Sequence, residues 1–393
     1  MKTLIELYDE RPLENVLATE VFRPERTIFL CPQEIVQDKV RQRKLREYFQ
    51  HRGVESECIF LESSLYNAAK VKRQLQGIME KYEDCVLDIT GGTDAALFGG
   101  GLLCADSDLP VFTYSRKKGE FYNIHNADFA ENLPCEIQYN VEDCFLMAGG
   151  AMRMGRVDNA VLGQYMDVID PFFALYMKHR RDWTRIVSYI QRISQTDKDA
   201  PATLSASGNY TVKGEQGRWV TAHEEALRDL EKLGFIQQLT IVTDESVSFT
   251  FKDLQIRSWL RDIGSVLELY IYKACLDTGI FQDVHTSAVV DWEGDFQRDS
   301  VTNELDVMAM KGVISVFISC KTCQVSTEAL NELAILRDRF GGGMSRAAIV
   351  TAERTRSVTR HRAEALNIKI IDLDDLKTDA VKDLLCALMG EDN

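Results

Sequence analysis

The sequence lacks the features that mark several large classes of proteins. None of its apolar runs approaches the roughly 18 residues that a membrane-spanning helix needs. The G-x-S-x-G and H-E-x-x-H motifs of serine hydrolases and zinc peptidases do not occur, and the six histidines show no ligand spacing. Internal repeats and low-complexity tracts are also missing. What is left is a globular chain of 393 residues, long enough for two or three domains, with a composition typical of soluble proteins.

Cysteines are present, but their spacing predicts no disulfide framework. Ten of them are scattered singly, mostly within apolar segments such as 27–31 and 83–89. The segment Met1–Glu6 becomes acidic too early for a signal peptide, so we expect reduced cysteines in a cytoplasmic protein. Cys320 and Cys323 form a C-x-x-C pair, yet with no second pair and no helix start this spacing predicts neither a zinc site nor a redox site.

The net charge of −15 argues against tight, nonspecific binding of duplex nucleic acid, which requires a basic surface. It does not exclude a nuclease, because carboxylates that hold a divalent metal raise the negative count and the metal returns positive charge locally. Two basic runs, 41–46 and 354–362, stand out from this background. Each is either a solvated helix face or part of a binding surface.

Residues 1–148 alternate strand and helix patterns, which predicts an α/β, Rossmann-like domain with a mostly parallel sheet. Ligands of such sheets bind beyond the carboxyl ends of the strands. The turn Thr90-Gly91-Gly92-Thr93 lies there, between a strand at 85–89 and a helix, where glycines let backbone amides approach a phosphate and threonines add donors. Gln33 would line the same rim. The alternative is a plain strand-to-helix turn, since neither G-x-G-x-x-G nor G-x-x-x-x-G-K-[ST] is present.

Residues 149–257 have a different character. Helical patterns lead into a polar stretch at 195–217, and Thr221 and Glu224 then have the spacing of a capping box. The helix that follows stops at Gly234, and strands at 235–236 and 247–251 complete the outline of a winged helix. This helix is acidic overall, unlike one that reads the major groove, so we interpret the segment as a structural or linking domain.

Residues 258–393 carry the strongest catalytic signature. Glu304 and Asp306 lie two apart on one predicted strand and Lys321 ends the next strand of a hairpin. Glu268 lies among apolar residues of a predicted helix, where a carboxylate is costly to bury unless it is paired or bound to metal. Asp306, Glu268 and the backbone carbonyl of Cys320 would suit Mg²⁺ or Mn²⁺, and Lys321 would orient water or stabilise charge. The alternative is a surface hairpin with scattered charges.

The order of these residues resembles that of the PD-(D/E)xK, restriction-endonuclease-like nucleases over about the last 135 residues of the chain. Glu268, Asp306 and Lys321 match the helix glutamate, the metal aspartate and the lysine of that family. Ser319 stands where most members carry a carboxylate. Either Glu268 or Glu304 supplies the missing charge, or the metal is held more weakly. Asp291, Glu293 and Asp295 form a second acidic cluster. We interpret it as a solvated loop; the alternative is that one of these residues is a metal ligand.

The whole chain, with its Rossmann-like domain, winged-helix-like domain and restriction-endonuclease-like domain, resembles the CARF-domain nucleases that accompany type III CRISPR systems. The resemblance implies a homodimer in which two CARF domains bind one cyclic oligoadenylate, often the four-membered ring. Binding would switch on a metal-dependent endonuclease that cuts single-stranded RNA, DNA or both in antiviral defence. By position, Thr90, Gly91, Gly92 and Thr93 would contact the activator, with Gln33 and Gly150 as further candidates.

Two other functions stay open from the sequence. The first is a ligand-responsive transcription regulator that uses the winged helix. This hypothesis predicts salt-sensitive binding of duplex DNA without metal. The acidic helix of the winged-helix-like segment argues against this function. A nucleotide-binding metabolic enzyme is disfavoured by the missing dinucleotide fingerprint.

Overall fold

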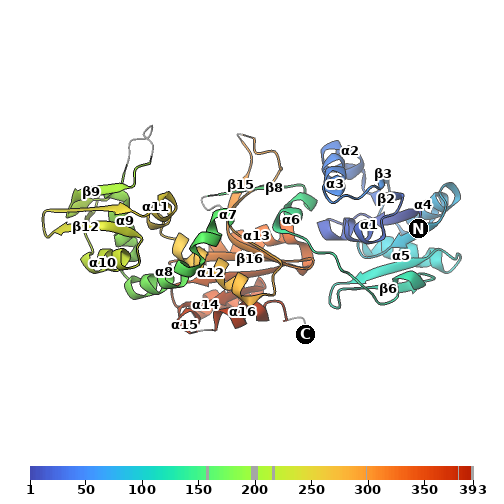
Figure 1. Ribbon diagram of the computed structural model, residues 1–393. Helices are drawn as coiled ribbons and strands as arrows, with labels where there is room; N and C mark the ends of the chain where they lie inside the picture. The colour runs from blue at the N-terminus through green and yellow to red at the C-terminus, as the bar shows by residue number, and fades with distance from the viewer. Residues whose placement is uncertain (156–158, 196–201, 215–216, 298, 379, 391–393) are drawn as a thin grey trace.

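The computed structural model describes residues 1–155, 159–195, 202–214, 217–297, 299–378 and 380–390. Its three parts lie in a row, with the central segment of the chain at one end, the C-terminal sheet in the middle and the N-terminal domain at the other end (Figure 1). The predicted fold class, α/β with several domains, is confirmed. Among the described residues, no helix has the length and apolar character needed to cross a membrane.

The N-terminal domain is built on a seven-stranded sheet of order β3-β2-β1-β4-β5-β6-β7. The first five of these strands in the order run parallel, and β6 and β7 are antiparallel additions at one edge. The strands are β1 (Thr3–Leu7), β2 (Arg26–Cys31), β3 (Glu57–Glu62), β4 (Cys85–Asp88), β5 (Val111–Ser115), β6 (Glu120–His125) and β7 (Leu133–Pro134). The helices are α1 (Leu17–Phe22), α2 (Gln33–Gln37), α3 (Lys39–His51), α4 (Ala68–Lys81) and α5 (Asp94–Cys104).

Residues 32–52 have the apolar spacing of one helix in the sequence, but the structure divides them into α2 and α3. Asp38 leaves the helical conformation with φ −77° and ψ 84°, and its side chain accepts a hydrogen bond from the backbone N–H of Arg41. It therefore caps α3 and separates it from α2, because an aspartate at this position satisfies a backbone donor that the start of a helix leaves open.

The central domain contains two small sheets, β12-β13-β9 and β10-β11, all antiparallel. Its strands are β9 (Ser205–Asn209), β10 (Thr211–Lys213), β11 (Trp219–Thr221), β12 (Ile236–Val242) and β13 (Ser246–Phe251). Its helices are α7 (Asn159–Leu162), α8 (Met166–His179), α9 (Trp183–Ile193), α10 (Glu224–Lys232) and α11 (Leu254–Leu260). The predicted wing is present as β12 and β13. The predicted capping box is wrong: α10 begins after His223, whose Nδ1 accepts the N–H of Ala226.

The C-terminal domain has a six-stranded sheet of order β18-β17-β16-β15-β14-β8. Its strands are β14 (Asp283–Asp291), β15 (Thr302–Lys311), β16 (Ile314–Lys321), β17 (Arg346–Thr351), β18 (Ile368–Ile371) and β8 (Ala151–Met154). Its helices are α12 (Ser265–Thr278), α13 (Thr327–Leu336), α14 (Ser357–Ala365), α15 (Leu373–Leu376) and α16 (Val381–Ala387). The edge strand β8 comes from the segment between the first and second domains and pairs with β14.

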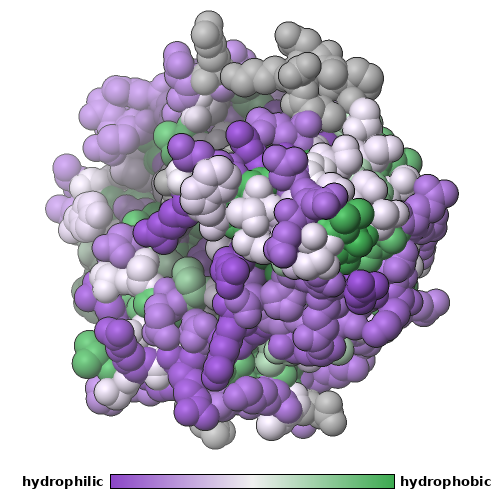
Figure 2. All heavy atoms as spheres, turned by 90° about the vertical axis from the view of Figure 1, so that its left-hand side faces the viewer, coloured by the Kyte–Doolittle hydropathy of each residue, from purple (hydrophilic) through white to green (hydrophobic). Residues whose placement is uncertain are grey.

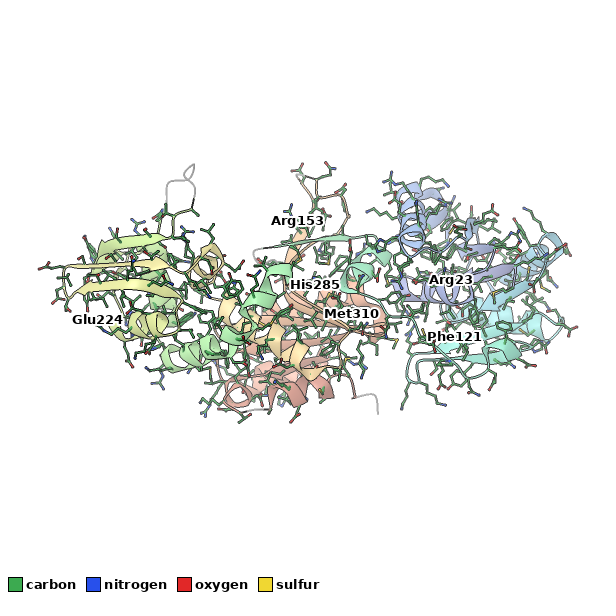
Figure 3. All side chains as sticks on the ribbon, viewed as in Figure 1. Arg23, Phe121, Arg153, Glu224, His285 and Met310 are labelled. Atoms are coloured by element: carbon green, nitrogen blue, oxygen red, sulfur yellow. The ribbon has the colours of Figure 1, made fainter. Side chains whose placement is uncertain are left out.

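Helix α6 (Val141–Met147) joins the N-terminal domain to this sheet. Its Phe145 packs against Phe317 of β16 and against Phe340, with ring centroids 6.5 and 5.1 Å apart. One buried apolar cluster consequently runs from the N-terminal domain into the C-terminal domain. Phe121 and Met310, labelled in Figure 3, are members of this cluster in the two domains. The two domains are therefore packed through a shared core as well as linked by the chain.

Candidate active site and activator site

The strand pair β15–β16 separates at one end, and Asp306 fills the opening. The last paired residues of the ladder at this end are Val307 and Ile318. Beyond them, Oδ2 of Asp306 accepts a hydrogen bond of 2.6 Å from the backbone N–H of Cys320 and one of 3.0 Å from the hydroxyl of Ser319. A side-chain carboxylate thus takes the place of a ladder carbonyl, and this fixes its position at the end of the sheet.

Lys321 approaches the same oxygen. Its ammonium lies 3.4 Å from Oδ2 of Asp306. Burial by itself would lower the pKa of Lys321. The charge of Asp306 and its hydrogen bond to the ammonium, together with the charges of Cys320 and Glu332, outweigh burial and raise the pKa above the usual value. Lys321 is therefore a protonated donor at neutral pH. The structure brings Asp306, Ser319 and Lys321 together as the alternation of the two strands predicts.

Glu268 reaches this region from α12, which packs against β14, β15 and β16. Its Oε1 would lie only 2.7 Å from a Cβ atom placed on Gly264, so the side chain folds back over the start of the helix. Its charge is felt at Cys320: burial raises the pKa of this thiol well above its usual value, and the charges of Asp306 and Glu268 raise it further. Both carboxylates therefore act electrostatically on Cys320, and its thiol is held in the protonated, non-ligating form.

The donor set fits a hard divalent cation. The three hydrogen bonds to Asp306 all reach Oδ2, and Oδ1 takes none of them. Carboxylate oxygens of Asp306 and Glu268 are ligands of the type that Mg²⁺ and Mn²⁺ prefer. Ser319 uses its hydroxyl to hold Asp306. Glu304 is exposed and accepts a hydrogen bond of 3.3 Å from Ser287, on the neighbouring strand β14.

The prediction that the acidic cluster at 291–295 is a solvated loop is wrong for its first residue, Asp291. Asp291 is fully buried, and its carboxylate accepts hydrogen bonds from the backbone N–H groups of Glu293, Gly294 and Phe296 at 2.6–2.9 Å. Its pKa is lowered, because these bonds outweigh the effect of burial. Asp291 therefore shapes the loop between β14 and β15 through contacts that occupy both of its oxygens.

The turn at 90–93 is held in place by contacts within its own domain. The hydroxyl of Thr90 donates to Asp88 and accepts the N–H of Tyr114, and the hydroxyl of Thr93 donates to the carbonyl of Leu65. Gly92 has φ +100°, and a Cβ atom there would lie 2.7 Å from the Cβ of Leu7. The glycines are thus needed for close packing on the last residue of β1 and on Asp9 beyond it, and both hydroxyls serve to fix the turn.

Two arginines beside this turn were missed by the sequence analysis. Arg11 follows β1 and Arg116 follows β5, so both stand at the carboxyl ends of parallel strands, where ligands of such sheets bind. Each contacts the buried Glu14, and Arg11 also forms an ion pair with Asp9 at 2.9 Å. The N–H of Gly92 donates to Asp9 as well, which connects the arginines to the turn. Their places after strand ends were the sequence signal that could have identified them.

The two remaining candidates for the activator site lie apart from each other. Gln33 is exposed at the start of α2, at the carboxyl end of β2. Gly150 is buried, and a Cβ atom there would lie 2.7 Å from the ring of Phe340 and 2.8 Å from the carbonyl of Asp291. The structure therefore places Gly150 in the packing of α6 on the C-terminal domain.

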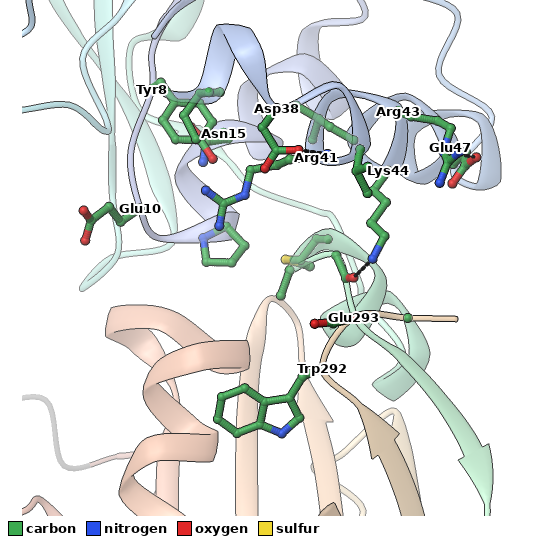
Figure 4. A pocket seen from close by; sticks show the side chains of 18 of the residues that line it. Tyr8, Glu10, Asn15, Asp38, Arg41, Arg43, Lys44, Glu47, Trp292 and Glu293 are labelled. Atoms are coloured by element: carbon green, nitrogen blue, oxygen red, sulfur yellow. Dashed lines mark hydrogen bonds and ion pairs between the residues drawn. The ribbon is translucent and has the colours of Figure 1, made fainter. Parts of the chain in front are cut away.

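A cavity of about 640 Å³ lies between the N-terminal and C-terminal domains (Figure 4). Tyr8, from the segment after β1, and Arg41 line one side, whereas Trp292 and Arg339 belong to the other domain. Burial and the positive charge of Arg41 together lower the pKa of Arg339. Lys44 donates a hydrogen bond of 2.8 Å to the carbonyl of Gly149 at the same border. An anion in this cavity would relieve the repulsion between the two guanidinium groups.

One group of potential metal ligands forms that the histidine spacing did not predict. His179, Glu225 and Asp229 come together between α8 and α10. Lys178 bridges the two carboxylates at 2.7 and 2.6 Å, and His179 lies 2.9 Å from Asp229. Lys178 and His179 lower the pKa of Asp229. These contacts explain the group as an ion-pair network that joins the two helices.

Comparisons with known proteins match this architecture. Residues 257–388 match the family model described as "Card1-like, endonuclease domain". A search of curated proteins found no match. The computed structure resembles the crystal structure of protein VC1899 from Vibrio cholerae, with a TM-score of 0.75, 17% identity, and coverage of 99% of this chain and 98% of that one.

It also resembles the structure of Can2 from Sulfobacillus thermosulfidooxidans, determined in complex with cyclic tetra-adenylate. The TM-score is 0.72 and the identity 17%, with coverage of 98% of this chain and 99% of that one. At this identity the likeness shows the fold. Together with the endonuclease match, it confirms the resemblance to the CARF-domain nucleases of type III CRISPR systems.

Proposed function

We propose that this protein is a metal-dependent endonuclease that a cyclic oligoadenylate switches on, and that it cuts single-stranded RNA, DNA or both. The observation that carries the proposal is the contact of Asp306 with Lys321 at one end of the sheet, with Glu268 on the helix packed against the same strands, in the domain that matches the Card1-like endonucleases. The geometry supports hydrolysis of a phosphodiester.

Each of the three residues has a defined part in this chemistry. Asp306 and Glu268 would hold Mg²⁺ or Mn²⁺, with the carbonyl of Cys320 as a further candidate ligand. The ion would lower the pKa of a bound water and stabilise charge on the phosphate. Lys321, whose ammonium lies 3.4 Å from Asp306, would stabilise the negative charge that develops on the phosphate oxygens. Its proposed part is electrostatic.

The activator would bind at the carboxyl rim of the N-terminal sheet. Arg11 and Arg116 supply positive charge beside the turn at 90–93, as an anionic ring of nucleotides requires. The cavity next to this rim extends to Arg339 of the C-terminal domain. A phosphate held between Arg41 and Arg339 would connect the two domains. The activator can switch the enzyme only if it binds the active arrangement better than the resting one.

A homodimer would complete this site. Tyr66, Phe98 and Leu102 are 82%, 64% and 38% exposed, and Phe98 and Leu102 lie one turn apart on α5, the helix that the turn at 90–93 begins. Tyr66 follows Leu65, whose carbonyl accepts the hydroxyl of Thr93. A second copy that covers this apolar surface about a two-fold axis would bring two rims together around one symmetric ring.

The proposal is tested by separating cleavage from activator binding. We expect the Asp306→Ala variant to lose cleavage of labelled single-stranded RNA and DNA with Mn²⁺, while isothermal titration shows unchanged affinity for cyclic tetra-adenylate. Asp383→Ala, which removes an exposed carboxylate from α16 of the same domain, is the matched control and should cleave normally. Wild-type cleavage rates in the Asp306→Ala variant would disprove the assignment of the active site.

A further inference from the structure

Basic side chains predominate among the charged residues that the structure describes around a hollow in the central domain, although the chain carries a net charge of −15. Its volume is about 470 Å³. Four arginines line it, and none of the described residues that line it is acidic. The lining is made up of Thr184, Arg185, Ser188, Gln191, Arg192, Gln195, Gly214, Arg218, Val220, Arg261 and Ile263. Figure 2 looks onto the end of the molecule that this domain forms, and the surface there is predominantly hydrophilic.

One wall of the hollow is the outer face of α9. The inner face of this helix is buried in the core of the domain through Trp183, Ile186, Val187, Ile190 and Ile193. The outer face consequently shows only polar and basic side chains at helical spacing. Arg185 forms an ion pair with Asp182 at 3.0 Å, with side chains that are 63% and 40% exposed. A pair this exposed is weak and leaves the guanidinium open to competition from a phosphate.

The opposite wall is the hairpin of β10 and β11. A backbone hydrogen bond of 2.9 Å from Gly214 to the carbonyl of Arg218 closes it, and Val220 anchors it in the core. This leaves Arg218 exposed at the rim, across from Arg192 on the helix. Arg261 has a structural part, because its guanidinium donates to the carbonyls of Gln191 and Ser194 at the end of α9.

The hollow adjoins the candidate active site through one short segment. Gln191 donates a hydrogen bond of 2.6 Å to the carbonyl of Arg261, and Trp183 donates one of 3.3 Å to the carbonyl of Ile263. The next residue is Gly264, over which Glu268 folds. Gly264 and Glu268 are four residues apart, a rise of about 6 Å along a helix. The segment 261–268 therefore contacts the wall of the hollow at one end and carries the carboxylate of Glu268 at the other.

We propose that this hollow is a second binding site for the substrate, which holds the sugar–phosphate backbone of single-stranded nucleic acid as it enters the active site. The inference rests on the proposed nuclease function. Arginines and amide side chains suit phosphate oxygens, and contacts of this kind position a strand without selecting its sequence. A groove between one helix and a hairpin suits a single strand of nucleic acid. Helix α10 is the element that would bind the groove of a duplex, and its carboxylates would repel the phosphates; they belong to Glu224, Glu225, Asp229 and Glu231.

The test compares two double variants with equal loss of charge in the same domain. Arg192→Gln with Arg218→Gln removes two guanidinium groups from the hollow, whereas Arg228→Gln with Lys232→Gln removes two exposed cations from α10. Both are made in the Asp306→Ala background so that the labelled single strands stay intact. The first pair should weaken binding and reduce the salt slope by about 1.4, at roughly 0.7 for each lost phosphate contact. The second pair should leave both quantities unchanged.

Equal affinities and salt slopes in the two double variants would overturn the proposal, as would a preference of the hollow for duplex nucleic acid.

Cleavage is then measured in the background that retains Asp306. The Arg192→Gln, Arg218→Gln enzyme should cut long strands with a raised KM and an unchanged kcat. If the wild-type protein proves to have no nuclease activity, the proposed function fails, but the binding comparison still decides whether the hollow holds single strands.

Discussion

Replacement of Lys321 by methionine isolates the electrostatic part of the proposed mechanism. The ammonium lies 3.4 Å from Oδ2 of Asp306 and at the end of β16, so its removal leaves the aspartate with the hydrogen bonds from Ser319 and Cys320. The pair is partly exposed, with Lys321 36% and Asp306 15% accessible, so the free energy of unfolding should change by no more than about 1 kcal/mol. The fold and the activator site should remain intact.

The loss should instead appear in the chemical step. A preorganised donor that stabilises charge in the transition state contributes about 2.7–4 kcal/mol, which corresponds to a decrease in kcat of roughly 10²–10³. The assay is single-turnover cleavage of a labelled single strand with saturating Mn²⁺ and activator, beside denaturant unfolding. Lys311→Met, at the exposed far end of β15, is the matched control. A Lys321→Met enzyme that cleaves at the wild-type rate would refute the reasoning.

Three further predictions follow from the geometry. Gly264→Ala places a methyl group 2.7 Å from Oε1 of Glu268, so cleavage should fall by about 10²-fold while stability stays nearly unchanged; equal cleavage by this variant and by Gly77→Ala would contradict the placement of Glu268. Burial raises the pKa of Asp88 to about 7, so the folded state holds a proton between about pH 4 and 7 that the unfolded state releases. Stability should therefore fall as pH rises through this window. Asp88→Asn should reduce the dependence of Tm on pH, and Glu6, whose pKa burial also raises, should supply the part that remains; an unaltered profile would contradict it. Phe98→Glu should convert the proposed dimer into monomers in light scattering and weaken activator binding. Val358→Glu, which changes an apolar residue that is 78% exposed in the C-terminal domain, should do neither.

The sequence predicts the hairpin of the active site well because the alternation of side chains on two strands determines which residues meet. Asp306, Ser319 and Lys321 lie together for that reason. Glu268 was recognisable as a carboxylate within an apolar helix. The sequence does not show how far the strands separate, and that separation lets the carboxylate of Asp306 bond to a backbone N–H.

Elsewhere local patterns were overridden by tertiary contacts. The central strand β1 was not predicted, since Glu6 interrupts its apolar run; in the fold Glu6 is buried opposite Asp88, and burial followed by the charge of Asp88 raises its pKa. Asp38 interrupts a pattern that otherwise indicates one helix. The turn at 90–93 lies where the alternation of strands and helices predicts it, but its hydroxyls are used within the domain, and the charged groups beside it come from distant strand ends.

The most direct test of the central claim is the dependence of cleavage on the activator. Purified protein is incubated with labelled single-stranded RNA and DNA and Mn²⁺, with and without cyclic tetra-adenylate, and a second ring size is tried in parallel. We expect cleavage only when a ring is present, and the strand that is cut identifies the substrate. No cleavage with either ring, or equal cleavage without any ring, would contradict an activator-controlled nuclease.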